Sequence, residues 1–285
     1  MMTQNRLYQQ FYREFYLHSG GWIPVMPLGC KLELGDFGQI ARGGFKPLGN
    51  ITQLRLVYEI KTTVPLALNP PDWQLESGLE KTSVSLYSQT NEQNISSTWS
   101  KQELALKQKG DFIFHGVEPK ARLICNWSEF KQDITLRLTQ TEYSFREVYL
   151  ITALATVKPW GLAIAGADNA ELDLVAETAQ TDSYALLSHH SVTMQHSRQL
   201  ALFENSADLP GYFFKAKKLV LSDRKKDQLI DRLLQKKAAQ GEPVLADWLS
   251  GDLLNSVQTN ELNAANCLEY FDWVDATLDD LEKLY

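Results

Sequence analysis

The longest mostly apolar stretch of the chain is VYLITALATVKPWGLAIAGA, which is interrupted by Lys158 and Pro159. A transmembrane helix needs about 20 predominantly apolar residues in a row, so this stretch does not predict one. Before the interruption, REVYLITALATV is apolar at both sets of alternating positions. The stretch therefore predicts a long strand that is either buried on both faces or changes its environment along its length.

Strand signals continue through most of the chain between Trp22 and about Asp223. DITLRLTQT is the clearest, because Ile134, Leu136 and Leu138 alternate with polar residues. Similar but less regular patterns run through ITQLRLVYEI, TSVSLYS, ELDLVAE and YFFKAKKLVLSD. Ahead of these strands, apolar residues at helical spacing in TQNRLYQQFYREFYLHSGG predict a short helix that ends at the paired glycines.

The pattern becomes helical after Asp223. DRKKDQLIDRLLQKKAAQG and PVLADWLSGDLL place their leucines on one side of a helix, and an amphipathic helix is expected where Phe271, Val274, Leu278, Leu281 and Tyr285 recur. We therefore expect a β-rich body over residues 1–222 and a helical, acidic C-terminal region over residues 223–285. The expected class is α+β, with a twisted, mainly antiparallel central sheet, peripheral helices and a helical C-terminal segment.

The net charge of −7 is unevenly distributed. Residues 241–285 hold ten Asp and Glu but one Lys, which leaves the rest of the chain nearly neutral. Such a body lacks the positive field that binds phosphate backbones, so we expect no nucleic-acid partner. The sequence shows no secretory signal pattern, and its three widely spaced cysteines match neither a disulfide framework nor a zinc site. A reducing, cytoplasmic location is therefore expected.

The glycine-rich stretch GDFGQIARGGFKPLGNI raises the possibility of a phosphate-binding loop. It lacks the Lys-Ser/Thr of a Walker loop and the G-x-G-x-x-G pattern of a dinucleotide site, and strand-like residues follow it. Paired glycines readily adopt positive φ, so Arg42-Gly43-Gly44 predicts a tight hairpin turn. We expect no cofactor here.

The sequence contains no pattern that indicates catalysis or metal binding. In SHHSVTMQH, His190 and His196 would lie roughly 20 Å apart on one strand, which is too far for a shared metal. Serine-nucleophile motifs are missing. We therefore expect no catalytic or metal-ligating residues and a protein that is not an enzyme. An unrecognised enzyme that uses His189, His190 or Cys125 is an alternative, and it requires the fold to bring these residues together.

The order of these elements resembles the pore-forming domain of gasdermins, especially the compact bacterial members. GGWIPVMPL and IARGGFKPLGNI look like the family's early strand and short hairpin. REVYLITALATVKPWGLAIAGADNAELDLVAE looks like its long strand, loop and return strand, and LPGYFFKAKKLVLSD looks like the strand that closes the domain. The resemblance covers roughly residues 20–223 and implies hairpins that open and span a membrane. Bacterial members carry a lipid-modified cysteine very near the N-terminus, whereas the first cysteine here is Cys30.

The alternation in VYLITALAT is compatible with a membrane-spanning strand, in which lipid-facing and lumen-facing residues alternate over about 9–11 residues. Hairpins over residues 82–114 and 146–176 are therefore expected to insert, although ordinary buried strands would give the same pattern. The candidate membrane-insertion residues are Val84, Leu86, Leu104, Leu106, Tyr149, Ile151, Val157, Trp160, Leu162 and Ile164.

The leading hypothesis is an autoinhibited pore-forming protein that acts in cell death or bacterial defence. The acidic tail would dock on the body through Trp248, Leu249, Phe271, Val274, Leu278 and Leu281. Release, for example by a protease near QTNELN, would let the hairpins enter membrane lipid and the chains form a homo-oligomer. The alternative is a non-enzymatic interaction module whose acidic amphipathic helices bind a partner.

Overall fold

The chain folds into three antiparallel sheets with a few small helices. The computed structural model describes residues 7–41, 44–90, 96–139, 148–222 and 267–281, together with Asp231 and Gln235. Every strand pairing in these residues is antiparallel, which confirms the predicted strand-dominated, mainly antiparallel class. The helices whose bounds lie within the described residues are α1 (Gln9–His18), α2 (Trp127–Thr139), α3 (Ser183–Leu187), α6 (Cys267–Tyr270) and α7 (Leu278–Leu281). In this part of the chain, no helix is long and apolar enough to cross a bilayer.

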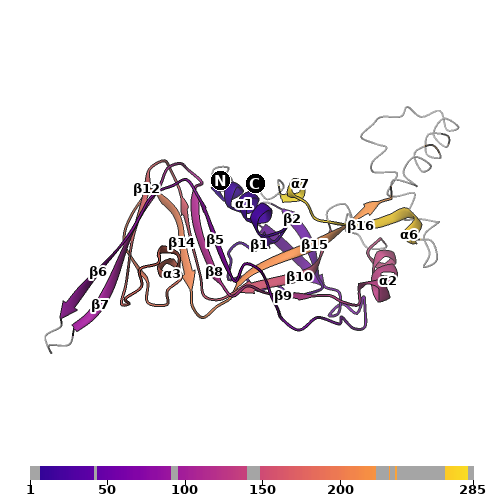
Figure 1. Ribbon diagram of the computed structural model, residues 1–285. Coiled ribbons are helices and arrows are strands. Elements are labelled where there is room, and N and C mark those ends of the chain that lie inside the picture. The colour runs from indigo at the N-terminus through magenta and orange to yellow at the C-terminus, as the bar shows by residue number, and fades with distance from the viewer. Residues whose placement is uncertain are drawn as a thin grey trace.

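An eight-stranded sheet forms one end of the described chain (Figure 1). Its main path runs β1-β15-β10-β2-β3, with β16 added to β15, β9 added to β10 and β4 added to β9. The strands are β1 (Ile23–Pro24), β2 (Asp36–Ala41), β3 (Gly44–Asn50), β4 (Leu66–Ala67), β9 (Lys120–Leu123), β10 (Tyr149–Val157), β15 (Gly211–Leu221) and β16 (Phe271–Asp275). β10 is buried along most of its length, as its apolar sequence predicted.

Two four-stranded sheets follow, which we call the inner sheet and the outer sheet. The inner sheet has the order β14-β11-β8-β5, with β5 (Asp72–Ser77), β8 (Phe112–Val117), β11 (Trp160–Ala165) and β14 (Leu200–Ser206). The outer sheet has the order β13-β12-β7-β6, with β6 (Leu79–Thr90), β7 (Ser96–Leu106), β12 (Ala170–Ala176) and β13 (Thr193–Arg198). Figure 1 shows the β6–β7 hairpin projecting away from the rest of the described chain, at the end opposite α2 and α6.

Helix α1 connects the eight-stranded sheet to the inner sheet. Phe11 and Phe15 lie one turn apart and are fully buried, as the helical spacing predicted. The Phe15 ring stacks on Phe213 of β15 at 4.5 Å and meets Trp73 of β5 and Phe114 of β8 edge-on. The helix thus joins both sheets through one aromatic cluster, since large rings bury much apolar area.

Each of the four strands of the inner sheet continues into a strand of the outer sheet through a bend, and the four bends lie side by side. β5 leads into β6 at Gly78, and backbone hydrogen bonds then link the bends in sequence, from Lys107 N to Gly78 O, from Asn169 N to Lys107 O and from Gly166 N to Gln199 O. Left-handed backbone occurs in each bend, at Gly78, Gly110, Asn169 and Gln199. These residues turn each strand out of one sheet plane and into the next.

Two segments predicted as strands have other structures. Residues 133–139 of the predicted strand DITLRLTQT belong to α2, because Phe130, Ile134 and Leu138 are spaced four residues apart and all three face the core. Residues 51–58 form turns, which begin where the Asn50 side chain accepts hydrogen bonds from the backbone and hydroxyl of Thr52.

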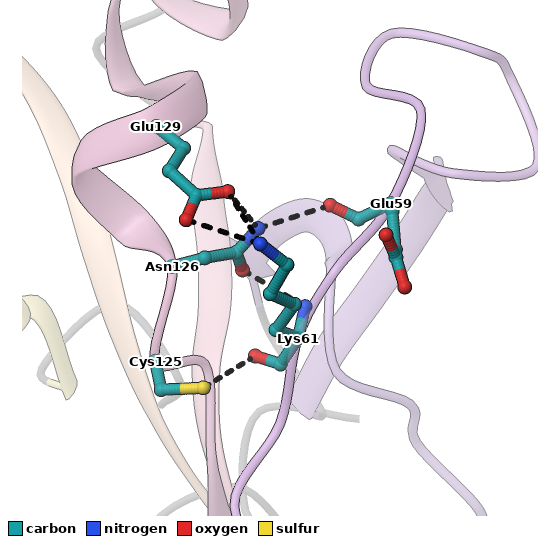
Figure 2. A network of polar contacts seen from close by, with 5 residues as sticks. All are labelled: Glu59, Lys61, Cys125, Asn126 and Glu129. Carbon is teal, nitrogen blue, oxygen red and sulfur yellow. Dashed lines mark hydrogen bonds and ion pairs between the residues drawn. The ribbon is translucent and has the colours of Figure 1, made fainter.

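The loop after these turns is tied to the start of α2, as Figure 2 shows. Asn126 accepts a hydrogen bond from Lys61 N and donates to Glu59 O, and the Lys61 ammonium lies 3.2 Å from both carboxylate oxygens of Glu129. These contacts fix where α2 begins, and the spacing of apolar residues in the sequence does not predict them.

The C-terminal residues also differ from the prediction. Phe271–Asp275 form β16 rather than an amphipathic helix. On one edge of β15, β1 pairs with Phe213 and Phe214, which leaves residues 217–221 of that edge for β16. Phe271 and Trp273 face the core while Asp272 and Val274 face outward, which is the period of a strand. The predicted helices over residues 223–241 and 243–254 lie almost wholly outside the described residues.

The glycine-rich stretch forms the predicted hairpin. β2 and β3 pair from Asp36↔Asn50 to Ala41↔Gly44, and the turn residues 42–43 lie outside the described chain. Gly38 sits at a bulge, where a β-carbon would meet Lys46 O at 2.2 Å. The glycines here let two strands approach each other closely.

Substitution of Gly78 by alanine tests the bend between β5 and β6. Gly78 has φ of 61°, and a β-carbon there would lie 1.7 Å from Asp111 Oδ2. We expect Gly78→Ala to lower the free energy of unfolding by about 2 kcal/mol, from backbone strain and displacement of Asp111. Denaturant unfolding measures the effect. The control is Gly29→Ala, which has open space and no positive φ, and it should change stability by less than about 0.5 kcal/mol. Equal stability of the two variants would contradict the account.

Candidate functional site

The inner and outer sheets together consist of two bent hairpins that lie side by side. The first bent hairpin spans residues 72–117, with β5 and β6 in one arm and β7 and β8 in the other. The second bent hairpin spans residues 160–206, with β11 and β12 paired to β14 and β13. The two hairpins meet where β8 pairs β11 and where β7 pairs β12. The expected hairpin at 82–114 is therefore confirmed and longer than expected.

The expected hairpin over residues 146–176 is wrong in its first arm. β10 pairs with β15, β2 and β9 in the eight-stranded sheet and not with β11 or β12. The return arm comes from residues 193–206, whose sequence TMQHSRQLALFENS was not assigned to a hairpin. Neighbouring strands in the sequence need not pair, and only the long-range register identifies this partner.

The outer sheet has one apolar face and one charged face. On β7 and β12, buried residues alternate with partly exposed ones, and Leu104 lies opposite Leu172 while Glu103 lies opposite Asp173. We call the side that holds Val84, Leu104, Leu106, Ala170, Leu172 and Leu174 the apolar face. We call the side that holds Lys81, Lys101, Glu103, Glu171, Asp173 and Arg198 the charged face. Strands that separate two environments have this alternation.

The segment between β12 and β13, residues 177–192, covers the apolar face, and we call it the α3 segment. Leu186 and Leu187 of α3 are fully buried and pack in one cluster with Leu104, Leu172 and Leu174. The close fit continues at Gly161 of β11, where a β-carbon would meet Leu187 O at 2.4 Å. The α3 segment therefore shields Leu104 of the first bent hairpin and Leu172 and Leu174 of the second from water.

Polar contacts fasten the α3 segment to the strands. Ser100 of β7 donates to the carbonyl oxygens of Thr178 and Gln180 at 2.9 and 2.7 Å. The hydroxyl oxygens of Thr82 and Ser183 lie 2.8 Å apart. Because Ser and Thr hydroxyls exchange such bonds readily with water, these contacts stabilise the cover only modestly.

Two buried polar side chains beneath the α3 segment lack full hydrogen bonding. Gln102 is completely buried, and no described residue lies within hydrogen-bond distance of either atom of its amide group. His115 of β8 is 3% exposed, and its Nδ1 lies 2.8 Å from Ser188 Oγ while its Nε2 meets no partner in the described chain. Burying such groups costs roughly 1–3 kcal/mol each, so the closed arrangement of the α3 segment is less stable than its apolar packing alone implies.

The environment of His115 disfavours a positive charge. Burial lowers the pKa of His115, and it outweighs the opposing effects of Asp72 and Asp182. The neutral imidazole is therefore the form that fits under the α3 segment.

The predicted insertion residues divide between the hairpins and the eight-stranded sheet. Leu104 and Leu106 are buried on the apolar face, Val84 is half-buried there, and Leu86 is exposed near the tip. Trp160, Leu162 and Ile164 are buried in β11, in the cluster around α1. Tyr149, Ile151 and Val157 lie in β10, apart from the bent hairpins. Sequence reasoning did not identify the six residues of the charged face, although the alternation in KQELAL is a signal for them.

The C-terminal residues 267–281 attach to the body through buried contacts, and we call them the C-terminal clasp. Trp273 donates from Nε1 to Thr135 Oγ1 at 2.8 Å, and its ring meets Trp127 edge-on. Asp280 is 2% exposed and accepts hydrogen bonds from Lys218 Nζ at 2.7 Å and from Tyr149 Oη at 2.8 Å. Burial by itself raises the pKa of Asp280, but the hydrogen bonds from Lys218, Thr277 and Tyr149 hold it below its ordinary value.

The predicted tail residues take different positions in this clasp. Phe271 is fully buried, Leu278 is half-buried, and Val274 is exposed on the outer side of β16. Trp248 and Leu249 lie outside the described residues, as does the side chain of Leu281.

A pocket of about 430 Å³ lies between α1, α2 and the clasp. Lys215 projects into it, but its ammonium donates to Gly20 O at the end of α1 and lies 5.0 Å from the centre of the Trp22 ring. Lys217 is paired with Asp275 at 2.6 Å. Both cations in this pocket therefore stabilise helix α1 and the clasp.

The residues of the alternative enzyme hypothesis do not share a site. Cys125 donates a hydrogen bond to Lys61 O at the start of α2 (Figure 2). His189 and His190 follow α3, and their ring centres lie 4.3 Å apart. α2 and α3 lie at opposite ends of the described chain in Figure 1, which separates the cysteine from the histidines.

Acidification should loosen the α3 segment. Because the pKa of His115 in the folded protein lies below its ordinary value, the open form binds the proton more readily, and stability is lost as the pH falls below about 6.5. We expect hydrogen exchange of residues 183–192 to become faster between pH 7 and pH 5, after correction for intrinsic rates, by about tenfold for each unit of pKa depression. His115→Gln should flatten this dependence, whereas His196→Gln on exposed β13 should leave it unchanged. An unchanged profile in His115→Gln would exclude His115 as the cause.

Removing the charge of Asp280 should loosen the C-terminal clasp. Asp280→Asn leaves the Lys218 ammonium without its partner, and we expect the stability of β16 to fall by about 2 kcal/mol, less than for a fully buried pair because Lys218 is partly exposed. Native-state hydrogen exchange of the β16 amides measures this. The matched control is Asp275→Asn, which removes an exposed ion pair with Lys217 and should cost less than about 0.5 kcal/mol. Equal effects would mean that Asp280 does not hold the clasp.

No family model and no curated protein matches this sequence. Among solved structures, the chain is similar to the cryo-EM structure of the gasdermin A3 membrane pore, at 10% sequence identity and a TM-score of 0.26. The similarity covers 75% of this chain and 90% of that chain. A TM-score of this size does not establish a common fold, so the argument for function rests on the two bent hairpins.

Proposed function

We propose that this chain is a pore-forming protein whose two bent hairpins straighten, enter a lipid bilayer and form a pore by oligomerisation. One observation carries the proposal: neighbouring antiparallel strands β6, β7 and β12 present apolar side chains such as Val84, Leu104 and Leu172 to a separate cover, while the opposite side of the same sheet holds charged residues in water. A membrane β-barrel needs strands of this kind, with lipid on one side and water on the other.

The strands of the first bent hairpin are long enough for this role. β6 has 12 residues and β7 has 11, and a tilted membrane-spanning strand needs about 9–11. Leu104 and Leu172 would exchange their contact with α3 for contact with lipid, which leaves them apolar surroundings in both states. Gln102 and Ser100 are polar exceptions on this face. Lipid would offer the Gln102 amide no more hydrogen bonds than α3 does, and Ser100 would lose its bonds to Thr178 and Gln180.

The strand number supports assembly from repeated copies. The outer sheet is antiparallel throughout, so its edge strands β6 and β13 run in opposite directions. If β6 of one copy lies beside β13 of the next, the two strands run antiparallel and the alternation continues. With an odd number of strands in each copy, the two edge strands would run in the same direction and this pairing would be parallel. Both edge strands are largely exposed in the described chain, and an unpaired edge is a template for another strand.

The C-terminal clasp is the proposed inhibitory element. It occupies the free edge of β15 and buries Phe271 and Trp273 against the core. Proteolysis between β15 and β16, for example near QTNELN, would remove the covalent link that keeps the clasp at high local concentration. In this proposal the uncleaved form is cytoplasmic, the cleaved form binds membrane lipid, and the biological role is cell death or bacterial defence.

The second candidate is an interaction module that uses the acidic C-terminal region. Its amphipathic helix loses residues 271–275, because these form β16. A partner captured through residues 223–266, together with no effect on membranes, would favour this candidate.

An engineered disulfide between α3 and β6 tests the proposed mechanism. With Cys30, Cys125 and Cys267 changed to serine, Thr82→Cys and Ser183→Cys place two thiols where hydroxyl oxygens lie 2.8 Å apart. Dye release from liposomes is measured with the full chain before and after limited proteolysis between residues 223 and 266. We expect release only after cleavage, its loss in the oxidised disulfide variant, and its return on reduction, because the cover must leave before the strands straighten.

The matched control is the disulfide Thr90→Cys with Ser96→Cys, at the end of the β6–β7 hairpin. Its hydroxyl oxygens lie 3.1 Å apart, and a bond there joins two strands that stay paired in the pore. This variant should release dye whether oxidised or reduced. If no form releases dye, the protein is not a pore-former. If the α3 disulfide has no effect, the α3 segment is not the cover that must leave.

A further inference from the structure

The charged face of the outer sheet carries a ladder of ion pairs across all four strands. Lys81 of β6 lies 2.8 Å from Glu103 of β7, and Lys101 of β7 reaches Asp173 of β12 at 3.2 Å. Glu171 of β12 lies 2.7 Å from Arg198 of β13. These six side chains are three cations and three anions, and each is at least partly exposed.

We propose that this ladder lines the lumen of the pore and balances its charge, so that the pore passes small cations and small anions alike, with Lys101 as the residue that sets the balance. This inference rests on the proposed function and adds to it the class of solute that the pore admits. Rings of charged side chains along a lumen decide which ions enter it.

The choice of face follows from hydration. The charged face lies in water in the described chain, and the α3 segment covers the opposite face. Turning the charged face towards a water-filled lumen requires no desolvation of its ions, whereas turning it towards lipid would cost several kcal/mol for each charge at mid-bilayer. The ladder can therefore stay as it is when the apolar face exchanges its cover for lipid.

Lys101 is central because it separates two like charges. Glu103 and Asp173 are direct cross-strand partners, and two carboxylates in this position repel each other. The Lys101 ammonium lies 2.9 Å from Glu103 and 3.2 Å from Asp173, so it neutralises both. Hydrogen bonds from Lys81 and Lys101 lower the pKa of Glu103 to about 2, which keeps this carboxylate ionised at any cellular pH.

In a ring of identical subunits, an excess of positive or negative charge on the charged face of one subunit is repeated in every subunit. Without Lys101, every subunit would present two carboxylates to the lumen with only Lys81 nearby, and the ring would attract cations. Without Glu103, every subunit would carry one excess positive charge and attract anions. Such fields raise the local concentration of counter-ions by tenfold or more in favourable cases, most strongly at low salt.

The test measures ion selectivity in planar bilayers with the full chain after the same limited proteolysis. A potassium chloride gradient from about 0.01 to 0.1 M keeps the Debye length at roughly 10–30 Å, so that lumen charges are felt. We expect the unmodified chain to reverse close to zero after correction for electrode potentials. Lys101→Gln and Arg198→Gln should both shift the reversal potential towards cation selectivity, and Glu103→Gln should shift it towards anion selectivity.

The control is Lys31→Gln, which breaks an equally short and exposed ion pair with Glu33, outside both bent hairpins. It should conduct with the selectivity of the unmodified chain. If the three variants of the charged face conduct but keep that same selectivity, the charged face does not line the lumen, and the proposed pore-forming function still stands. If no form conducts and none releases dye from liposomes, the proposed function and this inference fall together.

Discussion

The arrangement of the molecule depends on the contact between the α3 segment and the apolar face of the two bent hairpins. Leu186 and Leu187 fill the concave side of strands that would otherwise expose Leu104, Leu172 and Leu174 to water. Large exposed apolar patches mark interaction surfaces or aggregation sites, and this contact removes these leucines from the exposed surface. The cover comes from a loop between two strands, and the rest of the sheet does not need it in order to pair.

The α3 segment covers polar side chains without satisfying all of their hydrogen bonds. Gln102 and His115 lie beneath it without full hydrogen bonding in the described chain. Apart from its leucines, the segment is held by hydroxyl contacts, which include the hydrogen bond that Tyr184 donates to the Glu76 carboxylate. A segment that buries leucines but leaves polar groups unsatisfied is stable but close to an alternative arrangement, because its apolar gain is offset by desolvation. The row of left-handed residues at Gly78, Gly110, Asn169 and Gln199 has a similar effect, since these residues would adopt ordinary β geometry if the strands straightened.

Prediction from the sequence succeeded where the local period matched the burial of the side chains. The segments of β10, β12 and β15 were predicted as strands and form strands, and α1 carries Phe11 and Phe15 one turn apart. The prediction failed in α2. Ile134 and Leu138 fit the spacing of a strand and that of a helix, and Phe130, four residues before Ile134, fits only the helix on the same buried face. It failed again at Phe271–Asp275, because a free edge of β15 about 50 residues earlier in the sequence selects a strand.

The sequence by itself determined the strand-rich body and the hairpin at the paired glycines, because period-two alternation and glycine turns are local properties. Only the tertiary structure decided that β10 belongs to the eight-stranded sheet, that residues 193–206 supply the fourth arm, and that the charges of four strands form one ladder. The physical reason is that pairing partners and cross-strand ion pairs are set by hydrogen-bond register between distant segments. No local period encodes that register.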